Sequence, residues 1–125
     1  SCMLRLPQNR FCIENRAADM CMNPYLSLAL TTASVLDGIK NKIDPGKPLN
    51  LNLYTLSPEE IKAANIKSLP RNLLEAIEAL NEDEFAREVL GESMLHQFFS
   101  YKMDEWDRYH QSVTDWEVQE FLRLY

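Results

Sequence analysis

Hydrophobic and polar residues alternate at the N-terminal end of the chain before the pattern changes to helical spacing. Residues 2–6 and 10–15 form two short runs separated by Pro7-Gln8-Asn9, a sequence typical of a tight connection between strands. In the second run Phe11 and Ile13 alternate with other residues, so one face of this strand is expected to pack on a core. The pattern therefore predicts a short β-hairpin.

The first long helix is expected to begin at Asn23-Pro24, because asparagine caps free N–H groups and proline fits the first helical turn. The helix should continue to about Ile43 and end at residues 44–48, where two prolines and a glycine break the hydrogen-bond ladder. Apolar residues recur at helical spacing, which predicts a central, well-buried helix. These positions are Leu26, Ala29, Leu30, Ala33, Leu36 and Ile39.

Start and stop signals predict further helices along the rest of the chain. The predicted starts are Ser57-Pro58, Asn72, Asp83, Ser93 and Thr114, and the marked ends are Gly91 and about Leu124. Trp106 and Trp116 are expected to face a core. The fold class is therefore mainly α with a short N-terminal β-hairpin, in which residues 1–16 form the β element and residues 23–125 are helical.

The charge and the length of the apolar runs argue against two kinds of binding partner, nucleic acid and membrane. The 125 residues carry a formal net charge of -6, with a pI near 4.9. Binding to nucleic acid is not expected, because phosphate contacts need clustered lysine and arginine. The longest apolar run, residues 25–36, falls short of the roughly 20 residues that a membrane span needs, so no membrane partner is expected either. Since no secretory signal is visible, a cytoplasmic location is expected.

The three cysteines, Cys2, Cys12 and Cys21, lie in the first part of the chain without CxxC spacing. An odd number with this spacing favours neither a disulfide framework nor a zinc site. We expect reduced thiols that are mostly buried.

The polar residues that are candidates for a functional site lie before and around the first predicted helix start. They are Arg10, Glu14, Arg16, Asp19 and Asn23. Residues two apart on a strand share a face, so Glu14 and Arg16 should lie side by side. From the pattern alone, the favoured interpretation is structural, with Glu14 and Arg16 as a surface ion pair and Asn23 as a helix cap.

Several longer motifs add a family resemblance. Ile13-Glu14-Asn15-Arg16, followed after six residues by Asn23-Pro24-Tyr25-Leu26, resembles the glutamine synthetase signature I-E-x-R-x-P-D-P-x-x-N-P-Y-L. Residues 36–46 are similar to the family's L-D-G-I-K-N-K-I-x-P-G, and Asn52-Leu53-Tyr54 with Ser57-Pro58-Glu59-Glu60 is similar to N-L-Y-x-L-P-P-E-E. Arg5-Leu6-Pro7 resembles the family's R-I-P, and residues 69–76 resemble a further family segment. The resemblance runs from Arg5 to the end of the chain.

The resemblance implies the C-terminal segment of the α+β catalytic domain of an ATP-dependent ligase. In that family the residue corresponding to Glu14 helps to bind Mg²⁺ or Mn²⁺, and the residue corresponding to Arg16 contacts substrate carboxylate or phosphate. The family reaction forms γ-glutamyl phosphate from glutamate and ATP, and ammonia or another amine then attacks it. The parent is expected to form a homo-oligomeric ring. No catalytic residue is assigned within this segment, which is expected to be inactive alone.

The sequence departs from the family at Cys12, where bacterial glutamine synthetases often have an arginine near the nucleotide phosphates. Arg10, expected on the same strand face as Cys12, is a candidate nucleotide-binding residue that compensates for this change. Tyr54 aligns with a tyrosine that some bacterial members adenylylate, although a packed tyrosine is the commoner interpretation. The segments around Trp106 and Trp116 resemble the branch that includes γ-glutamyl-polyamine ligases, which leaves the amine acceptor open.

The sequence is also compatible with a second function class. The chain is alternatively a stand-alone, non-catalytic remnant that uses its acidic helical surface to bind or regulate another protein. The size of the native polypeptide discriminates between the two interpretations.

Overall fold

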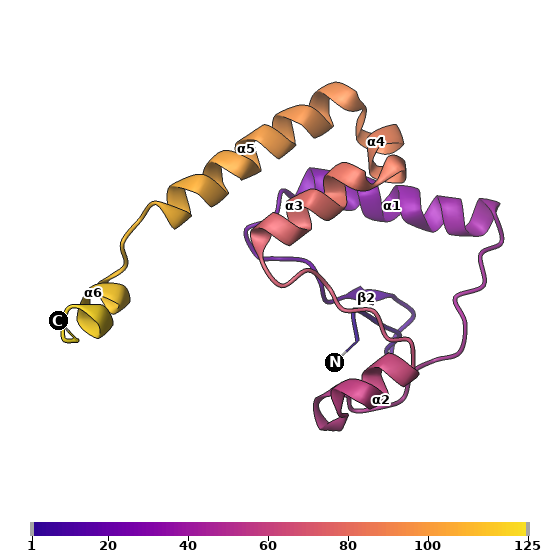
Figure 1. Cartoon of the computed structure of the whole chain (residues 1–125). Coiled ribbons are helices and arrows are strands. Elements are labelled where there is room, and N and C mark those ends of the chain that lie inside the picture. Colours follow the sequence, from indigo (N-terminus) through magenta and orange to yellow (C-terminus); the bar gives the residue numbers. More distant parts are fainter. Residues whose placement is uncertain (1, 125) are drawn as a thin grey trace. The chain divides into compact units, whose positions relative to one another are not determined.

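The computed structural model describes residues 2–124, and contacts within the chain divide it after Ser68 into two compact units. Figure 1 shows the helices and strands of both units. The first unit contains strands β1 (Leu4–Arg5) and β2 (Glu14–Asn15), helix α1 (Pro24–Lys40), the 3-10 helix η1 (Leu53–Thr55) and helix α2 (Pro58–Ala63). The second contains helices α3 (Leu73–Glu82), α4 (Glu84–Leu90), α5 (Glu92–His110) and α6 (Asp115–Phe121). The predicted mainly α fold with an N-terminal hairpin is confirmed.

The hairpin is shorter than the sequence pattern predicts. β1 and β2 pair in antiparallel fashion, with Leu4 opposite Asn15 and Arg5 opposite Glu14. The connection therefore runs over residues 6–13 and not only over 7–9, because Pro7 has no N–H to donate to a ladder. Phe11 and Ile13 lie in this connection and are exposed, so the prediction that they pack on a core is wrong for this chain.

Helix α1 begins where its cap predicts and ends earlier. The Asn23 side-chain Oδ1 accepts hydrogen bonds from the backbone N–H groups of Tyr25 and Leu26, at 3.0 and 3.2 Å. The helix ends at Lys40, three residues before the predicted end, and Lys42 has a positive φ of 51°, which no longer fits the helix. No residue of α1 is buried, so the predicted burial is wrong within the described chain.

The second unit has a small apolar core. Helices α3, α4 and α5 pack on one another, and each contributes one buried residue: Ile77, Ala86 and Leu95. Asn72 caps α3 by accepting from the N–H of Glu75 at 2.9 Å, as predicted. Gly91, with a φ of 78°, ends α4 in a left-handed conformation that glycine adopts without strain.

Capping boxes open two short helices, α2 and α6, as predicted. Ser57 accepts from the N–H of Glu60 at the start of α2, and Thr114 accepts from the N–H of Glu117 at the start of α6, both at 3.2 Å. Helix α6 ends at Phe121, somewhat before the predicted Leu124.

The two tryptophans differ in their surroundings. Trp106 is partly buried, and its ring lies 3.7 Å from the ring of His110, between centroids. Trp116 is exposed and contacts Phe121 edge to face, so the prediction that it faces a core is wrong within this chain. An apolar position at helical spacing predicts a buried face only if something is present to cover it.

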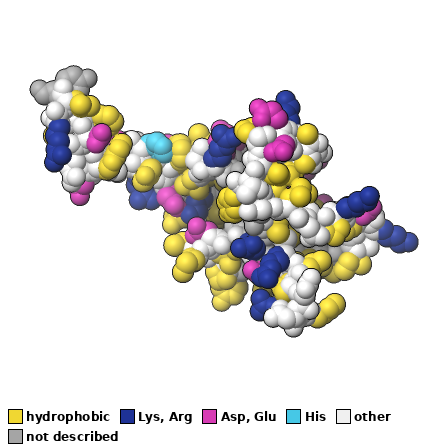
Figure 2. Space-filling model, turned by 90° about the horizontal axis from the view of Figure 1, so that it is seen from below, with side chains coloured by type: hydrophobic (Ala, Val, Ile, Leu, Met, Phe, Trp, Pro, Cys, Tyr) yellow, Lys and Arg dark blue, Asp and Glu magenta, His cyan; other side chains and the backbone are white. Residues whose placement is uncertain are grey.

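Large apolar side chains reach the surface in both units, as the yellow side chains in Figure 2 show. In α1 and the loop after it, the exposed residues include Tyr25, Leu28, Val35, Leu36, Ile39 and Ile43. Cys2, Cys12 and Cys21 are free thiols, as expected, but all three are exposed, so the prediction that they are mostly buried is wrong. Within residues 2–124, no helix combines the length and the apolar character needed to cross a membrane.

Candidate functional site

The register of the hairpin brings Glu14 to the centre of a group of arginines. Arg5 on β1 is the direct cross-strand partner of Glu14 on β2, and directly opposite residues in an antiparallel pair project on the same face. The guanidinium Nη1 of Arg5 donates a hydrogen bond to the Glu14 Oε2 at 3.0 Å. Arg5 therefore contacts the carboxylate from the β1 side.

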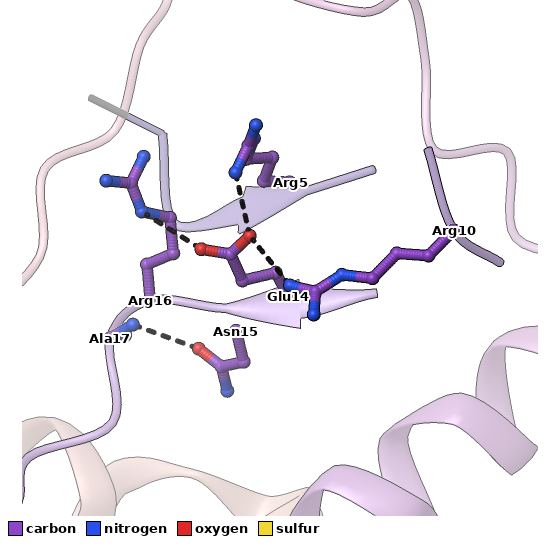
Figure 3. A network of polar contacts seen from close by, with 6 residues as sticks. All are labelled: Arg5, Arg10, Glu14, Asn15, Arg16 and Ala17. Carbon is purple, nitrogen blue, oxygen red and sulfur yellow. Dashed lines mark hydrogen bonds and ion pairs between the residues drawn. The ribbon is translucent and has the colours of Figure 1, made fainter. Parts of the chain in front are cut away.

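Two further arginines approach the same carboxylate (Figure 3). Arg10 Nη2 lies 3.9 Å from Oε2 of Glu14, and Arg16 Nε lies 3.8 Å from Oε1. Together with Arg5 they place three cations around one anion, which we call the arginine cluster: Arg5, Arg10 and Arg16 around Glu14. The predicted placement of Glu14 beside Arg16 is confirmed.

Backbone contacts position Arg16 just beyond the end of β2. Its backbone N–H donates to the carbonyl of Met3 at 2.8 Å, which continues the hairpin pairing by one bond. The next residue, Ala17, donates its N–H to the Asn15 side-chain Oδ1 at 3.0 Å and so turns the chain away from the strand. The Arg16 side chain is therefore held on the Glu14 face by the local backbone.

The cluster is accessible to solvent and carries an excess of positive charge. The Glu14 side chain is 31% exposed, and the three arginine side chains are more exposed still. Three guanidinium groups against one carboxylate leave two uncompensated positive charges. Planar guanidinium groups match the oxygen geometry of carboxylates and phosphates, so this face of the hairpin is suited to binding an anionic group.

Glu14 is chemically suited to be one ligand of a hard divalent cation, since carboxylate oxygens are the donors that Mg²⁺ and Mn²⁺ prefer. It is not a complete site. Across residues 2–124, no group of three or more histidine, cysteine, aspartate and glutamate side chains is arranged to hold a metal ion. Among the described residues, Glu14 can therefore offer a divalent cation one carboxylate ligand but not a complete site.

Arg10 reaches the cluster from a different structural context than predicted. It lies in the connection between the strands and not on a strand, so the prediction that Arg10 and Cys12 share a strand face is wrong. The Cys12 backbone N–H donates to the Arg10 carbonyl at 3.2 Å, which indicates a tight bend at this point. The bend leaves the Arg10 side chain free to fold back toward Glu14.

Asp19, Asn23 and Tyr54 lie outside the arginine cluster. Asp19 accepts a hydrogen bond from the Cys21 N–H at 2.6 Å, and Asn23 caps α1, so both stabilise local backbone turns. Tyr54 lies in η1 and is 87% exposed, so the interpretation of a packed tyrosine is wrong within this chain.

Arg5 is the member of the cluster that sequence reasoning did not assign to a site. A tight turn at residues 7–9 would place Arg5 opposite Phe11, whereas the observed register places it opposite Glu14. The only sequence signal was the position of Arg5 in an Arg-Leu-Pro segment resembling a family motif.

Comparisons with known proteins agree with the motifs. Residues 1–121 match the family described as glutamine synthetase, catalytic domain. The chain is 41% identical over 127 residues to a glutamine synthetase of Methanosarcina mazei, and 38% identical over 126 residues to a glutamine synthetase of Staphylococcus aureus (strain MRSA252). These matches cover 99% and 98% of this chain but 28% of each relative.

A solved structure points the same way. The chain resembles a structure described as apo GmaS without ligand, with a TM-score of 0.74 and 34% sequence identity over 96% of this chain and 27% of that one. The similarity in sequence and the similarity in fold point to the same family, and the family match extends over nearly the whole chain. The chain belongs to the glutamine synthetase catalytic-domain family.

Proposed function

We propose that this chain is the C-terminal portion, residues 1–125, of the catalytic domain of an ATP-dependent ligase. The ligase joins glutamate to ammonia or another amine by way of γ-glutamyl phosphate. The observation that carries the proposal is the arginine cluster around Glu14, which lies within the segment that matches the family. One carboxylate and three guanidinium groups on one face suit the handling of phosphoryl and carboxylate groups.

Glu14 is proposed as one ligand of Mg²⁺ or Mn²⁺, with the remaining ligands supplied by the parent protein outside this chain. Such a cation, when bound, neutralises phosphate charge and favours phosphoryl transfer. The chain's own residues orient the reacting groups. Arg16 is proposed to bind the substrate carboxylate or phosphate, and Arg10 is proposed to contact the phosphates of ATP.

The isolated segment is proposed to be inactive, for two reasons. A single carboxylate holds a divalent cation weakly, because such ions need several oxygen ligands. The large apolar side chains exposed on α1 also indicate a surface that other parts of a larger domain cover, since monomeric proteins seldom expose so many together. This second point favours the ligase over a stand-alone remnant.

The accepting amine is tested with the full-length protein that carries this chain. Purified protein is incubated with glutamate, ATP and Mg²⁺, together with ammonia or one of a series of primary amines and polyamines. We expect phosphate release that requires both glutamate and one amine class, and mass spectrometry should identify the γ-glutamyl amide. Phosphate release that no amine stimulates would contradict the proposal.

The size of the native polypeptide separates the ligase from the remnant. An antibody raised against this chain is used to probe an extract of the source cells. A band several times larger than the 14.5 kDa of this chain is expected for a ligase. A band near 14.5 kDa would support the binding or regulatory remnant instead.

Two further properties belong to the proposed parent. It is expected to lie in the cytoplasm and to assemble into a homo-oligomeric ring. Mass photometry of the purified protein measures the mass of this assembly. The exposed Tyr54 phenol is a candidate for covalent modification. Peptide mass mapping of protein from its source would show an added group on Tyr54 if the modification occurs.

A further inference from the structure

Arginine side chains contact both oxygens of the Glu14 carboxylate, and a cation bound by Glu14 would need the same oxygens. Oε2 faces Arg5 and Arg10, and Oε1 faces Arg16. The geometry points to a competition device: the three arginines and a divalent cation compete for Glu14, and an anion that draws the arginines away raises the affinity of Glu14 for the cation. This inference rests on the proposed role of Glu14 as a metal ligand.

The three arginines come from three separate pieces of backbone, so each can leave Glu14 independently. Arg5 is on β1, Arg10 is in the connection between the strands, and Arg16 follows β2. Only the Arg5 contact is short enough to be a hydrogen bond, at 3.0 Å, whereas the other two contacts lie at 3.8 and 3.9 Å. Arg10 and Arg16 are therefore held mainly by charge, and a competing anion can recruit them with little loss of bonding.

Competition follows from electrostatics. A cation close to the Glu14 oxygens is repelled by each guanidinium that stays within about 4 Å of the same carboxylate. All four side chains are partly exposed, so each ion pair is weak and can be exchanged for another. An arginine that turns from Glu14 to an anion no longer repels the cation and no longer occupies a carboxylate oxygen.

The same argument makes the effect reciprocal. If an anion on the arginines strengthens cation binding by a given factor, the cation must strengthen anion binding by the same factor. Cation and anion then bind cooperatively, and the arginine cluster disfavours cation binding until an anion is present. A carboxylate that accepts no contact from arginine would not behave in this way.

The first test measures Mn²⁺ binding to the full-length protein without nucleotide, by electron paramagnetic resonance of free Mn²⁺. Glu14→Gln identifies the Mn²⁺ site that depends on Glu14. Arg10→Gln and Arg5→Gln each remove one competitor, and we expect about two- to fivefold tighter Mn²⁺ binding at that site, the range for losing an exposed ion pair. Arg10 lies outside the strands, so Arg10→Gln keeps the test valid if loss of Arg5 disturbs the hairpin.

Arg108→Gln is the matched control. Arg108 forms a single exposed ion pair with Asp104 at 2.8 Å on α5, so its loss removes an arginine without touching the cluster. We expect unchanged Mn²⁺ affinity in this variant. Tightening as large as in Arg10→Gln would show a general effect of net charge and would overturn the competition.

The second test repeats the titrations with inorganic phosphate as the anion. Direct association of Mn²⁺ with phosphate is measured without protein and is the same for every variant, so differences between variants report the coupling. Phosphate should tighten Mn²⁺ binding at the Glu14-dependent site in the unaltered protein, and Arg5→Gln and Arg10→Gln should reduce this tightening. Equal effects of phosphate in all proteins would overturn the coupling.

The outcomes separate the two proposals. If Glu14→Gln leaves every Mn²⁺ site unchanged, the metal assignment of Glu14 fails, and the competition fails with it. If Glu14→Gln weakens a site but the arginine variants bind Mn²⁺ there no more tightly, Glu14 remains a metal ligand and only the competition is overturned.

Discussion

The guanidinium of Arg5 lies directly across the hairpin from the carboxylate of Glu14, with 3.0 Å between Nη1 and Oε2. The two residues are nine positions apart in sequence, and only the strand register brings them together. A slip of one residue in this register would send one of the two side chains to the opposite face of the hairpin. The arrangement of the arginine cluster therefore depends on a hairpin of two residues in each strand.

Replacing Glu14 by glutamine should weaken the dependence of the proposed full-length ligase on its proposed divalent cation. Glutamine keeps the shape of the side chain but removes the charge that a hard cation prefers. Loss of a residue that hydrogen-bonds to a metal ligand typically lowers metal affinity about 10–100-fold. Loss of a ligand itself should therefore raise the Mg²⁺ or Mn²⁺ concentration for half-maximal rate by at least about tenfold. Steady-state rates over a range of metal concentrations measure this shift.

Glu92→Gln is the control for this prediction. Glu92 is an exposed glutamate paired with Arg87 at 2.8 Å, so the variant removes a similar ion pair away from the hairpin. Its metal dependence should match that of the unaltered protein. The metal assignment of Glu14 would be wrong if both variants behaved alike.

Replacing Arg16 by alanine should lower the rate of the proposed γ-glutamyl transfer in the full-length protein. The proposed role of Arg16 is to stabilise negative charge on a carboxylate or phosphate, and removal of one such donor typically lowers kcat by about 10²–10³-fold. Arg16→Lys keeps the charge but loses the planar fork, so it should recover only part of the rate. Initial rates with saturating ATP and amine test both variants, with Arg108→Ala on α5 as the control. Full activity in Arg16→Ala would remove Arg16 from the site.

Local signals predicted the starts of the helices well. Asn23, Ser57, Asn72 and Thr114 each cap the helix that they were expected to open, because a cap and its partners lie within three residues of one another. The side-by-side placement of Glu14 and Arg16 was equally predictable, since residues two apart near a strand share a face.

Non-local features were not predictable in this way. The pairing of Arg5 with Glu14 depends on the length of the connection, which the pattern placed at residues 7–9 and the structure extends over 6–13. The exposure of α1 and Trp116 has a different cause. Periodicity shows which face of a helix is apolar, but it does not show what covers this face, and this chain spans 28% of the length of the relatives that it matches.

Replacing Leu95 by alanine should destabilise the second unit. Leu95 is 2% exposed on α5, where α3 and α4 pack against it, so truncation leaves a cavity as well as losing buried area. Comparable buried leucine truncations cost about 2–5 kcal/mol. Urea unfolding monitored by tryptophan fluorescence measures the change. Ser100→Ala, at an exposed position of the same helix, should change stability by no more than about 0.5 kcal/mol, and equal losses in both variants would contradict a core role for Leu95.

Helix α6 should lose stability in acid through its capping box. Backbone and side-chain hydrogen bonds from Thr114 to Glu117 lower the pKa of the Glu117 carboxyl below its ordinary value of 4.5. The Thr114 N–H and Oγ1 both donate to Oε2 of Glu117, each at 2.7 Å, and only the ionised carboxylate accepts both well. Because the folded pKa is the lower one, the stabilisation is complete above the unfolded value and disappears as the pH falls through the folded value.

A peptide of residues 112–124 tests this pH dependence by circular dichroism at low temperature, where short helices are most populated. Helicity of the native peptide should fall on acidification from pH 6 to about pH 2, a range that spans full ionisation and protonation of a glutamate. In Glu117→Gln the side chain stays neutral over this range, so the fall should be smaller. The two peptides differ only at residue 117, and the difference between the two curves therefore isolates Glu117. Identical curves would show that the Glu117 carboxylate contributes nothing to the start of α6.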